Sequence, residues 1–221
     1  MNPGYESLLE AGTAVIADVF DSLGWQPPVL DTSLSPVKER GSAKFAGPAY
    51  TVSGESQLWS GGGDRAKLAA IDSMTPGVVP VWAGNDILGV CCFGDLLGSA
   101  MLARGCAGVV VDGGVRDVAF LRSIEMPVLA RYKTPAQAIG RWRVTARQTP
   151  VRVRGALEEW VTVRPGDLVV ADDDGVIVLP ADSLETIVTR VTEWSQGESG
   201  ARADIRNGMP LLQAVDKYGH L

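Results

Sequence analysis

The sequence predicts an α/β fold, with a single domain over residues 1–180 and a helical extension over residues 181–221. From Gly47 onward the chain contains short runs rich in β-branched residues. These runs are apolar almost without interruption, which is typical of strands buried on both faces of a sheet. Segments with helical spacing separate several of the runs, at residues 64–73, 95–105 and 116–124. Such alternation indicates a sheet covered by helices.

The parts of the domain on either side of this alternation differ from it. Residues 7–24 carry apolar positions at helical spacing and end at Gly24, which predicts one N-terminal helix. Residues 142–180 contain strand patterns with turn signals and no helix between them, so we expect antiparallel strands or a small barrel-like layer there. The strands expected before that layer lie at residues 48–54, 78–84, 87–93, 107–112 and 127–131.

The C-terminal extension is predicted to be helical but broken. Asp182 has a side chain suited to a helix N-cap, and a helix is expected from about residue 183 to 195. Gly197 and Gly200 are expected to interrupt it, because glycine weakens a helix interior. Helical patterning resumes in the tail, so we expect the extension to pack on the domain or on a neighbouring subunit.

Composition and charge argue against several kinds of function. The chain has 221 residues and a formal net charge of −6, and it lacks the clustered Lys and Arg that sequence-independent nucleic-acid binding requires. No stretch approaches about eighteen uninterrupted apolar residues, and the opening lacks the pattern of a signal peptide. We therefore expect a cytoplasmic protein that binds neither membranes nor nucleic acid.

Histidine and cysteine usage narrows the chemistry further. The only histidine is His220, next to the end of the chain, which leaves no basis for a His-based zinc site, a Ser-His-Asp triad or a Cys-His dyad. The three cysteines, Cys91, Cys92 and Cys106, lie in apolar segments and are predicted to be buried, reduced thiols. Any metal site should therefore be rich in oxygen ligands.

Two strand-to-helix junctions carry the most informative polar residues. Asp95 follows one apolar run and begins a helical run, so the amides after it should be unpaired helix N-terminal amides that bind a carboxylate. Arg116 and Asp117 follow the next apolar run, at the start of another helix. The carboxyl ends of neighbouring strands meet at one sheet edge, where an Asp can hold Mg²⁺ or Mn²⁺ and an Arg can bind a carboxylate or keto oxygen. The same spacing also fits a simple helix cap and a solvated ion pair.

The wording of this stretch, GDLLGSAMLARGCAGVVVDGGVRD, closely resembles the 4-hydroxy-4-methyl-2-oxoglutarate / 4-carboxy-4-hydroxy-2-oxoadipate aldolase family, which includes the ribonuclease E activity regulator A-like proteins. The resemblance extends from DVFDSLG through GPAYTV and RPGDLVVADDDGVIVLP to ESGARADIRNG, nearly the whole chain. It implies a compact β/β/α swivelling-domain fold, assembly as trimers or hexamers with active sites between subunits, and a divalent-metal-dependent pyruvate aldolase that uses Mg²⁺ or Mn²⁺.

The resemblance also implies a role for each residue that matches the family's motif. Asp117 matches the residue that coordinates the metal, and Arg116 matches the residue that contacts the keto or carboxylate oxygens of the substrate. Asp95 matches the acidic residue that orients metal-bound water. The amides expected to bind the pyruvyl carboxylate are those of Leu96, Leu97 and Gly98.

A fourth role falls on the C-terminal segment of a neighbouring subunit. The family's Glu-x3-Arg-x5-Gly spacing matches Glu198, Arg202 and Gly208, and it implies that Glu198 holds water at the metal. Glu198 could equally be an exposed acidic residue of a loop, because its glycine-rich neighbourhood is a poor helix former.

The reaction that the resemblance implies is retro-aldol cleavage of a 4-hydroxy-2-oxo diacid to a pyruvate enolate, with oxaloacetate decarboxylation as a side activity through the same enolate. No Schiff-base lysine is needed, and no lysine in the sequence, Lys67 included, has a special setting.

Two other functions compete with this one. A regulator of ribonuclease E would act by protein contact without catalysis, but those regulators tend to lack the final helical extension that this chain has. A methyltransferase would need a glycine-rich cofactor loop between a strand and a helix, and the sequence contains none.

Overall fold

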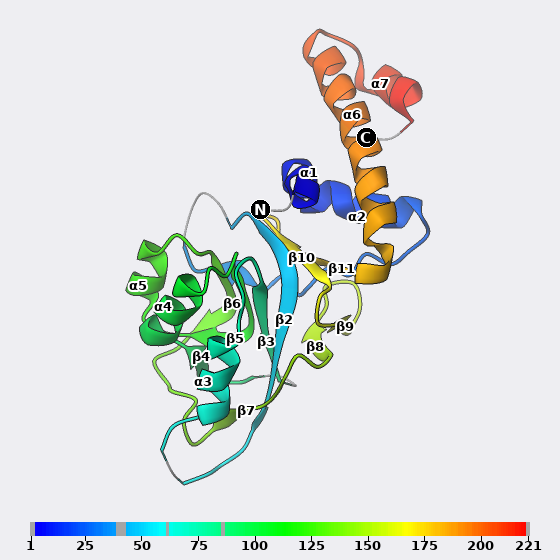
Figure 1. Cartoon of the computed structure of the whole chain (residues 1–221). Helices are drawn as coiled ribbons and strands as arrows, with labels where there is room; N and C mark the ends of the chain where they lie inside the picture. Colours follow the sequence, from blue (N-terminus) through cyan, green and yellow to red (C-terminus); the bar gives the residue numbers. More distant parts are fainter. Residues whose placement is uncertain (1–2, 39–42, 61, 85–86, 220–221) are drawn as a thin grey trace.

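A computed structural model describes residues 3–38, 43–60, 62–84 and 87–219, and shows a curved mixed sheet with helices on it and a helical arm that projects from one end (Figure 1). The sheet has the order β1-β6-β5-β3-β2-β10-β11, with β4 also paired to β5 and β7 to β2. Its strands are β1 (Ser35–Pro36), β2 (Phe45–Ser56), β3 (Val79–Ala83), β4 (Cys91–Phe93), β5 (Val109–Val115), β6 (Val128–Lys133), β7 (Trp142–Arg147), β10 (Leu168–Ala171) and β11 (Val176–Leu179).

Strand β2 joins two different halves of this sheet. Its middle part runs parallel to β3, and β3, β5 and β6 continue the parallel arrangement. Its first half pairs antiparallel with β10, and its end pairs antiparallel with β7. A separate antiparallel hairpin is formed by β8 (Val151–Arg154) and β9 (Trp160–Val163). The predicted α/β class and the antiparallel character of the segment after residue 142 are both confirmed.

Helices and the hairpin cover different surfaces of the sheet. The helices α3 (Arg65–Asp72), α4 (Asp95–Ala103) and α5 (Val118–Ser123) contribute buried apolar side chains to one core cluster, and they correspond to the three predicted helical segments. The hairpin β8–β9 packs its valines into a second cluster with β2, β3 and β10. The sheet is therefore buried on both faces, as its apolar runs predict.

The predicted single N-terminal helix is wrong, because the chain forms α1 (Pro3–Ala11) and α2 (Thr13–Ser22) with a break between them. Gly12 has a left-handed backbone with a φ of 89°. The next residue, Thr13, donates its N–H and its hydroxyl to the Asp172 carboxylate, at 2.7 and 2.6 Å. This carboxylate belongs to the turn between β10 and β11, so a tertiary contact sets the break.

The predicted interruption at Gly197 and Gly200 is also wrong, since α6 (Leu184–Arg206) runs through both glycines. Its N-cap is Ser183 rather than Asp182, which lies in a single 3₁₀ turn (Ala181–Ser183). A Cβ on Gly200 would lie 2.9 Å from the Tyr218 ring, so Gly200 allows α7 (Leu211–Tyr218) to approach. Packing outweighs the weak helix propensity of glycine here.

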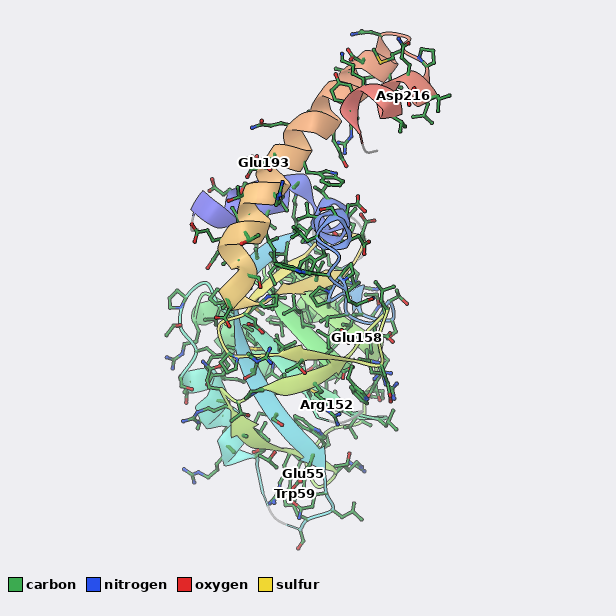
Figure 2. The ribbon with its side chains drawn as sticks, turned by 90° about the vertical axis from the view of Figure 1, so that its right-hand side faces the viewer. Glu55, Trp59, Arg152, Glu158, Glu193 and Asp216 are labelled. Carbon is green, nitrogen blue, oxygen red and sulfur yellow. The ribbon has the colours of Figure 1, made fainter. Side chains whose placement is uncertain are left out.

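The two C-terminal helices form the projecting arm. Residues of α1, α2 and the first half of α6 pack together against β10 and β11. Beyond this cluster, α6 and α7 extend away from the sheet, and Figure 2 shows Glu193 on α6 and Asp216 on α7 in that arm. In the described part of the chain, no helix combines the length and apolarity needed to cross a membrane.

Candidate active site

The first junction of the candidate site lies between β4 and α4. Gly94 separates the strand from the helix, and its carbonyl accepts the Gly98 N–H at 2.9 Å, which closes the first helical turn. The Leu96 N–H donates to the Asp95 carboxylate at 2.7 Å. The amides of Leu96 and Gly98 are thus engaged within the helix start in this structure.

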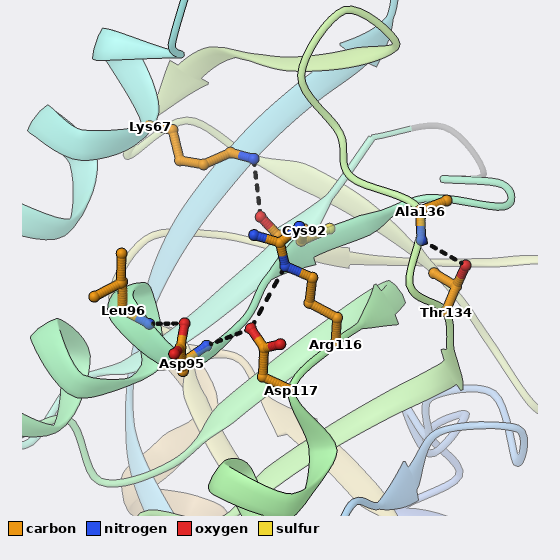
Figure 3. A network of polar contacts seen from close by, with 8 residues as sticks. All are labelled: Lys67, Cys92, Asp95, Leu96, Arg116, Asp117, Thr134 and Ala136. Carbon is orange, nitrogen blue, oxygen red and sulfur yellow. Dashed lines mark hydrogen bonds and ion pairs between the residues drawn. The ribbon is translucent and has the colours of Figure 1, made fainter.

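The second junction lies between β5 and α5, and short hydrogen bonds tie it to the first. The Arg116 N–H donates to the Phe93 carbonyl at 3.1 Å. The Asp95 N–H donates to Asp117 Oδ2 at 3.0 Å, and the same oxygen lies 3.5 Å from Arg116 Nε (Figure 3). The structure therefore brings Asp95, Arg116 and Asp117 together at one sheet edge, as their positions after neighbouring strands predict.

Two backbone features hold this arrangement in place. Asp117 has a left-handed backbone with a φ of 53°, which is uncommon for a residue other than glycine and better tolerated by Asp than by most. A Cβ on Gly94 would lie 2.0 Å from Asp117 Oδ2 and 2.8 Å from Arg116 Cγ. Only glycine at position 94 leaves room for both side chains.

The site opens into a cavity of about 220 Å³. Apolar side chains, among them Leu68 and Ile139, contribute to its lining. Arg116 also borders a more open hollow of about 420 Å³, which Asp117 and Lys133 line as well. The polar side chains that line the 220 Å³ cavity are Asp64, Lys67, Asp95, Arg116 and Gln137.

Lys67 was missed from sequence, and the prediction that it has no special setting is wrong. Its side chain is 6% exposed, and its Nζ donates to the Cys92 carbonyl at 2.8 Å (Figure 3). The Nζ also lies 5.1 Å from the Trp142 ring centroid and 5.9 Å from that of Trp82. Burial is the main cause that lowers the pKa of Lys67.

The sequence contains a signal that could have found this lysine. Lys67, Ala70 and Ile71 have the spacing of one helix face, and all three are buried. A lysine on the apolar face of a short helix is therefore placed at the core or at a cavity. Asp64 caps the same helix, since its carboxylate accepts the Lys67 N–H at 3.0 Å and the Val144 N–H at 2.8 Å.

The cysteines are poor metal ligands in this structure. All three are free and buried, as predicted. Burial raises the pKa of Cys92 to about 12 and that of Cys106 to about 11, and it also raises the pKa of Cys91. Protonated thiols neither coordinate metals nor act as nucleophiles.

The carboxylates fit a hard cation better than a soft one. Within the described residues, no group of three or more His, Cys, Asp or Glu side chains converges to hold a metal. Asp95 and Asp117 are the acidic pair at the junction, and Mg²⁺ needs only one or two protein carboxylates because it keeps several waters. His220 lies outside the described residues.

Glu198 does not join this group within one chain. It lies on α6, a helix rather than a loop, where it forms an ion pair with Arg202 one turn further along. It lines a hollow between α1 and α6 that also contains Glu10 and Ser195. Figure 1 shows α6 at the opposite end of the sheet from α4 and α5, so Glu198 could reach such a site only in another copy of the chain.

Comparison with known proteins gives consistent matches. Residues 13–178 match the family model described as RraA-like, Aldolase/RraA. Protein DlpA of Legionella pneumophila is 30% identical over 213 residues, which are 96% of this chain and 33% of that protein. The chain thus spans about a third of the length of DlpA.

Two further matches span most of both proteins. A Halalkalibacterium halodurans protein named "Putative 4-hydroxy-4-methyl-2-oxoglutarate aldolase" is 30% identical over 94% of this chain and 91% of its own length. The structure of Streptomyces coelicolor RraAS2, described as an unusual member of the RNase ES inhibitor RraA protein family, is similar with a TM-score of 0.76. It is 30% identical, and the match covers 91% of this chain and 96% of that one.

Proposed function

The chain belongs to the RraA-like family, and from this premise we propose that it is a carbon–carbon lyase, a divalent-metal-dependent pyruvate aldolase acting on 4-hydroxy-2-oxo diacids. The observation that carries the proposal is the convergence of Asp95, Arg116 and Asp117 at one edge of the sheet, where Asp95 and Arg116 line a cavity. The aldolase name of a relative that matches nearly the whole chain supports the reaction class.

Asp117 would hold the cation, Mg²⁺ or Mn²⁺. Its side chain is 38% exposed, and Oδ2 accepts a single backbone hydrogen bond, from Asp95. This carboxylate is therefore accessible from solvent. When bound, the cation supplies electrophilic stabilisation of negative charge on the substrate oxygens.

Arg116 would bind the substrate and stabilise the enolate. Its guanidinium borders the cavity, and its planar fork suits a carboxylate or a pair of carboxylate and keto oxygens. As the C3–C4 bond breaks, its electron pair moves into the C2–C3 enolate, and negative charge develops on the keto oxygen. The fixed positive charge of Arg116 favours that change.

Asp95 would position the water that takes the proton from the C4 hydroxyl, and the amides of Leu96, Leu97 and Gly98 would line the place of the pyruvyl carboxylate. Because the Leu96 N–H donates to the Asp95 carboxylate here, binding through that amide would require the Asp95 side chain to move. Binding through the Gly98 N–H would require its bond to the Gly94 carbonyl to lengthen. Oxaloacetate decarboxylation yields the same enolate, so we expect it as a side activity.

The proposal includes an assembly and a location. A homotrimer or homohexamer would bring Glu198 of one subunit to the Asp117 site of the next, where it would hold water at the cation. The described residues contain no membrane-spanning helix and the net charge is −6, which support a cytoplasmic enzyme without membrane or nucleic-acid partners.

The experiment that tests this function is a metal add-back assay. Purified protein is stripped with EDTA, dialysed, and given Mg²⁺, Mn²⁺ or buffer alone, and pyruvate release is measured from 4-hydroxy-4-methyl-2-oxoglutarate and from oxaloacetate. With metal added, we expect the protein to release pyruvate from both substrates faster than metal without protein does. In buffer alone, the stripped protein should release no pyruvate above background. An absence of metal-dependent release from both would exclude the proposed reaction.

A second candidate is regulation of a ribonuclease E-type enzyme by protein contact, favoured by the similarity to RraAS2. It predicts slower RNA cleavage by the ribonuclease when this protein is added, and an unchanged effect of Asp117→Asn. Inhibition that requires Asp117, or no inhibition at all, would favour the enzyme.

A further inference from the structure

The cavity next to Arg116 contains a second, buried cation. Lys67 comes from α3 and Arg116 from the end of β5, and Figure 3 shows both side chains extending toward Cys92 from opposite sides. Both line the cavity of about 220 Å³. Repulsion from Arg116 is among the causes that lower the pKa of Lys67. Two cations in so small a space indicate a ligand with more than one negative charge.

Packing alone does not account for a lysine at this position. Its neighbours on the helix face, Ala70 and Ile71, are buried apolar residues, and an unbranched apolar side chain would fill the same space without desolvating a charge. The Cys92 carbonyl and the two indole faces offset part of the cost. The remaining cost would be recovered when an anion enters the cavity.

Two carboxylates, those of Asp64 and Asp95, also line the cavity, and both accept backbone N–H groups. Both oxygens of Asp64 accept backbone N–H groups, from Lys67 and Val144, so this carboxylate serves as a helix cap. Of the three N–H donors of an ammonium group, one donates to the Cys92 carbonyl. Lys67 lines the cavity, so its other two donors can serve a ligand there.

We propose that Lys67 is a specificity-determining residue that binds the second carboxylate of the substrate, while Arg116 binds the 2-oxo acid end. This inference rests on the proposed aldolase function and extends it. Lys67 would select diacids over 2-oxo acids with a single carboxylate, and it would have no part in forming the enolate.

The test separates diacid binding from enolate formation in Lys67→Met. With Mg²⁺ present, KM and kcat are measured for the diacid 4-hydroxy-4-methyl-2-oxoglutarate, and deuterium exchange at C3 of pyruvate reports enolate formation without a second carboxylate. Loss of a charge-assisted hydrogen bond should raise the diacid KM by about tenfold to a hundredfold. The kcat and the pyruvate exchange rate should stay within about twofold of wild type. Lys44→Met, at an exposed lysine, is the matched control and should change neither.

Three outcomes would overturn the assignment. An unchanged diacid KM would make Lys67 a spectator. An equal loss of pyruvate exchange and diacid cleavage, in protein with a wild-type circular dichroism spectrum, would place Lys67 in the enolate chemistry. Borohydride trapping of pyruvate on Lys67, detected by mass spectrometry, would make it a covalent nucleophile.

A binding measurement without turnover keeps this inference separate from the proposed function. Glutarate and butyrate, a dianion and a monoanion, are titrated while tryptophan fluorescence is followed, because the ammonium lies against Trp82 and Trp142. Wild type should bind glutarate at least about tenfold more tightly, and Lys67→Gln, which keeps a donor for Cys92, should lose the preference. Equal binding by wild type would overturn the inference. A wild type that prefers glutarate yet neither exchanges nor cleaves would refute the aldolase and leave the role of Lys67 in diacid binding.

Discussion

Two regions of the molecule place acidic side chains in different ways. One is the pair of junctions with Asp95 and Asp117, and the other is helix α6 with Glu198. At the junctions, hydrogen bonds connect one strand-to-helix turn to the next, including the bond of 3.0 Å from the Asp95 N–H to Asp117. On α6, Glu198 pairs with Arg202 of its own helix. The fold of one chain therefore sets the geometry of Asp95 and Asp117. The side chain of Glu198, in contrast, is held only by a contact within its own helix.

The two regions differ in what each could contribute to the proposed shared site. The junctions supply the carboxylates of Asp95 and Asp117, and the cavity beside them supplies two cations. A third carboxylate, that of Asp64, also lines the cavity but accepts backbone N–H groups as a helix cap. No three acidic, His or Cys side chains of the described residues converge to hold a metal. The arm supplies Glu198, which lines a hollow. Arg202 is the one cationic residue among the described residues that line it. Each region is consistent with half of a site shared between copies of the chain.

The largest effect is expected from Asp117→Asn. Asparagine tolerates the left-handed backbone and keeps an acceptor for the Asp95 N–H, so the variant removes mainly the charge. We expect kcat to fall by about a thousandfold, because a bound cation contributes several kcal/mol of transition-state stabilisation. Steady-state cleavage measured against Mg²⁺ concentration checks this, with Asp174→Asn in the exposed turn after β10 as the control. Wild-type turnover in Asp117→Asn would remove Asp117 from the metal site.

A smaller loss is expected from Gly94→Ala, which tests whether the junction depends on its close packing. The new Cβ would overlap Asp117 Oδ2 and push the carboxylate and Arg116 out of place. We expect about a hundredfold loss of kcat and about 1–3 kcal/mol loss of stability in urea unfolding. The control is Gly62→Ala, where a Cβ meets nothing within 4 Å. Full activity in Gly94→Ala would show that the junction can relax.

The sequence predicts the junctions better than the arm, for a physical reason. Asp95 and Asp117 follow apolar strands directly, and a strand followed by a helix at the edge of a parallel sheet is a local pattern. The break at Gly12 depends on Asp172, and the continuity of α6 depends on Tyr218 over Gly200. Such contacts between distant segments leave no trace in local periodicity.

Lys67 shows the same limit within the site. Its place on the apolar face of α3 is visible in the sequence, through Ala70 and Ile71. Its partners are not visible, because Trp82 and Trp142 reach it from β3 and β7. The convergence of Asp95, Arg116 and Asp117 could be predicted from sequence and the structure shows it, while the chemical role of each residue stays a prediction.

Glu198→Gln should have an intermediate effect and tests whether the two regions act together. If Glu198 of one copy holds water at the site of another, its loss should lower kcat by about tenfold. Glu193→Gln is the matched control, since Glu193 also pairs with an arginine of α6, Arg190, and should have wild-type activity.

Mixing the two variants in one assembly extends this test. Co-assembled Glu198→Gln and Asp117→Asn subunits should be more active than the average of the two separate proteins, because some sites would receive both native residues. Activity equal to that average would contradict a shared site and leave Glu198 as a residue of the arm alone.

The smallest effect is expected from Asp204→Asn, which loosens the arm without touching the cavity. Asp204 Oδ2 accepts hydrogen bonds from Lys217 Nζ and from the Tyr218 hydroxyl, each at 2.7 Å, and these connect α6 to α7. The hydrogen bond from Lys217 is the main cause that lowers the pKa of Asp204 below its usual 3.8, and the reciprocal bond raises the pKa of Lys217 above 10.5. Amide exchange in α7 should become a few-fold faster in the variant, while kcat stays unchanged.

The direction of these pKa shifts gives the pH dependence of that contact. Because folding lowers the pKa of Asp204, its contribution is present above pH 3.8 and is lost as the pH falls through the folded-state value. Because folding raises the pKa of Lys217, its contribution is present below pH 10.5 and is lost only above it. Wild-type α7 should therefore lose protection below about pH 3.8, after correction for intrinsic exchange rates, and Asp204→Asn should show no such step. Asp216→Asn, on the exposed side of α7, should behave as wild type, and a step that persists in Asp204→Asn would show that another carboxylate fastens α7.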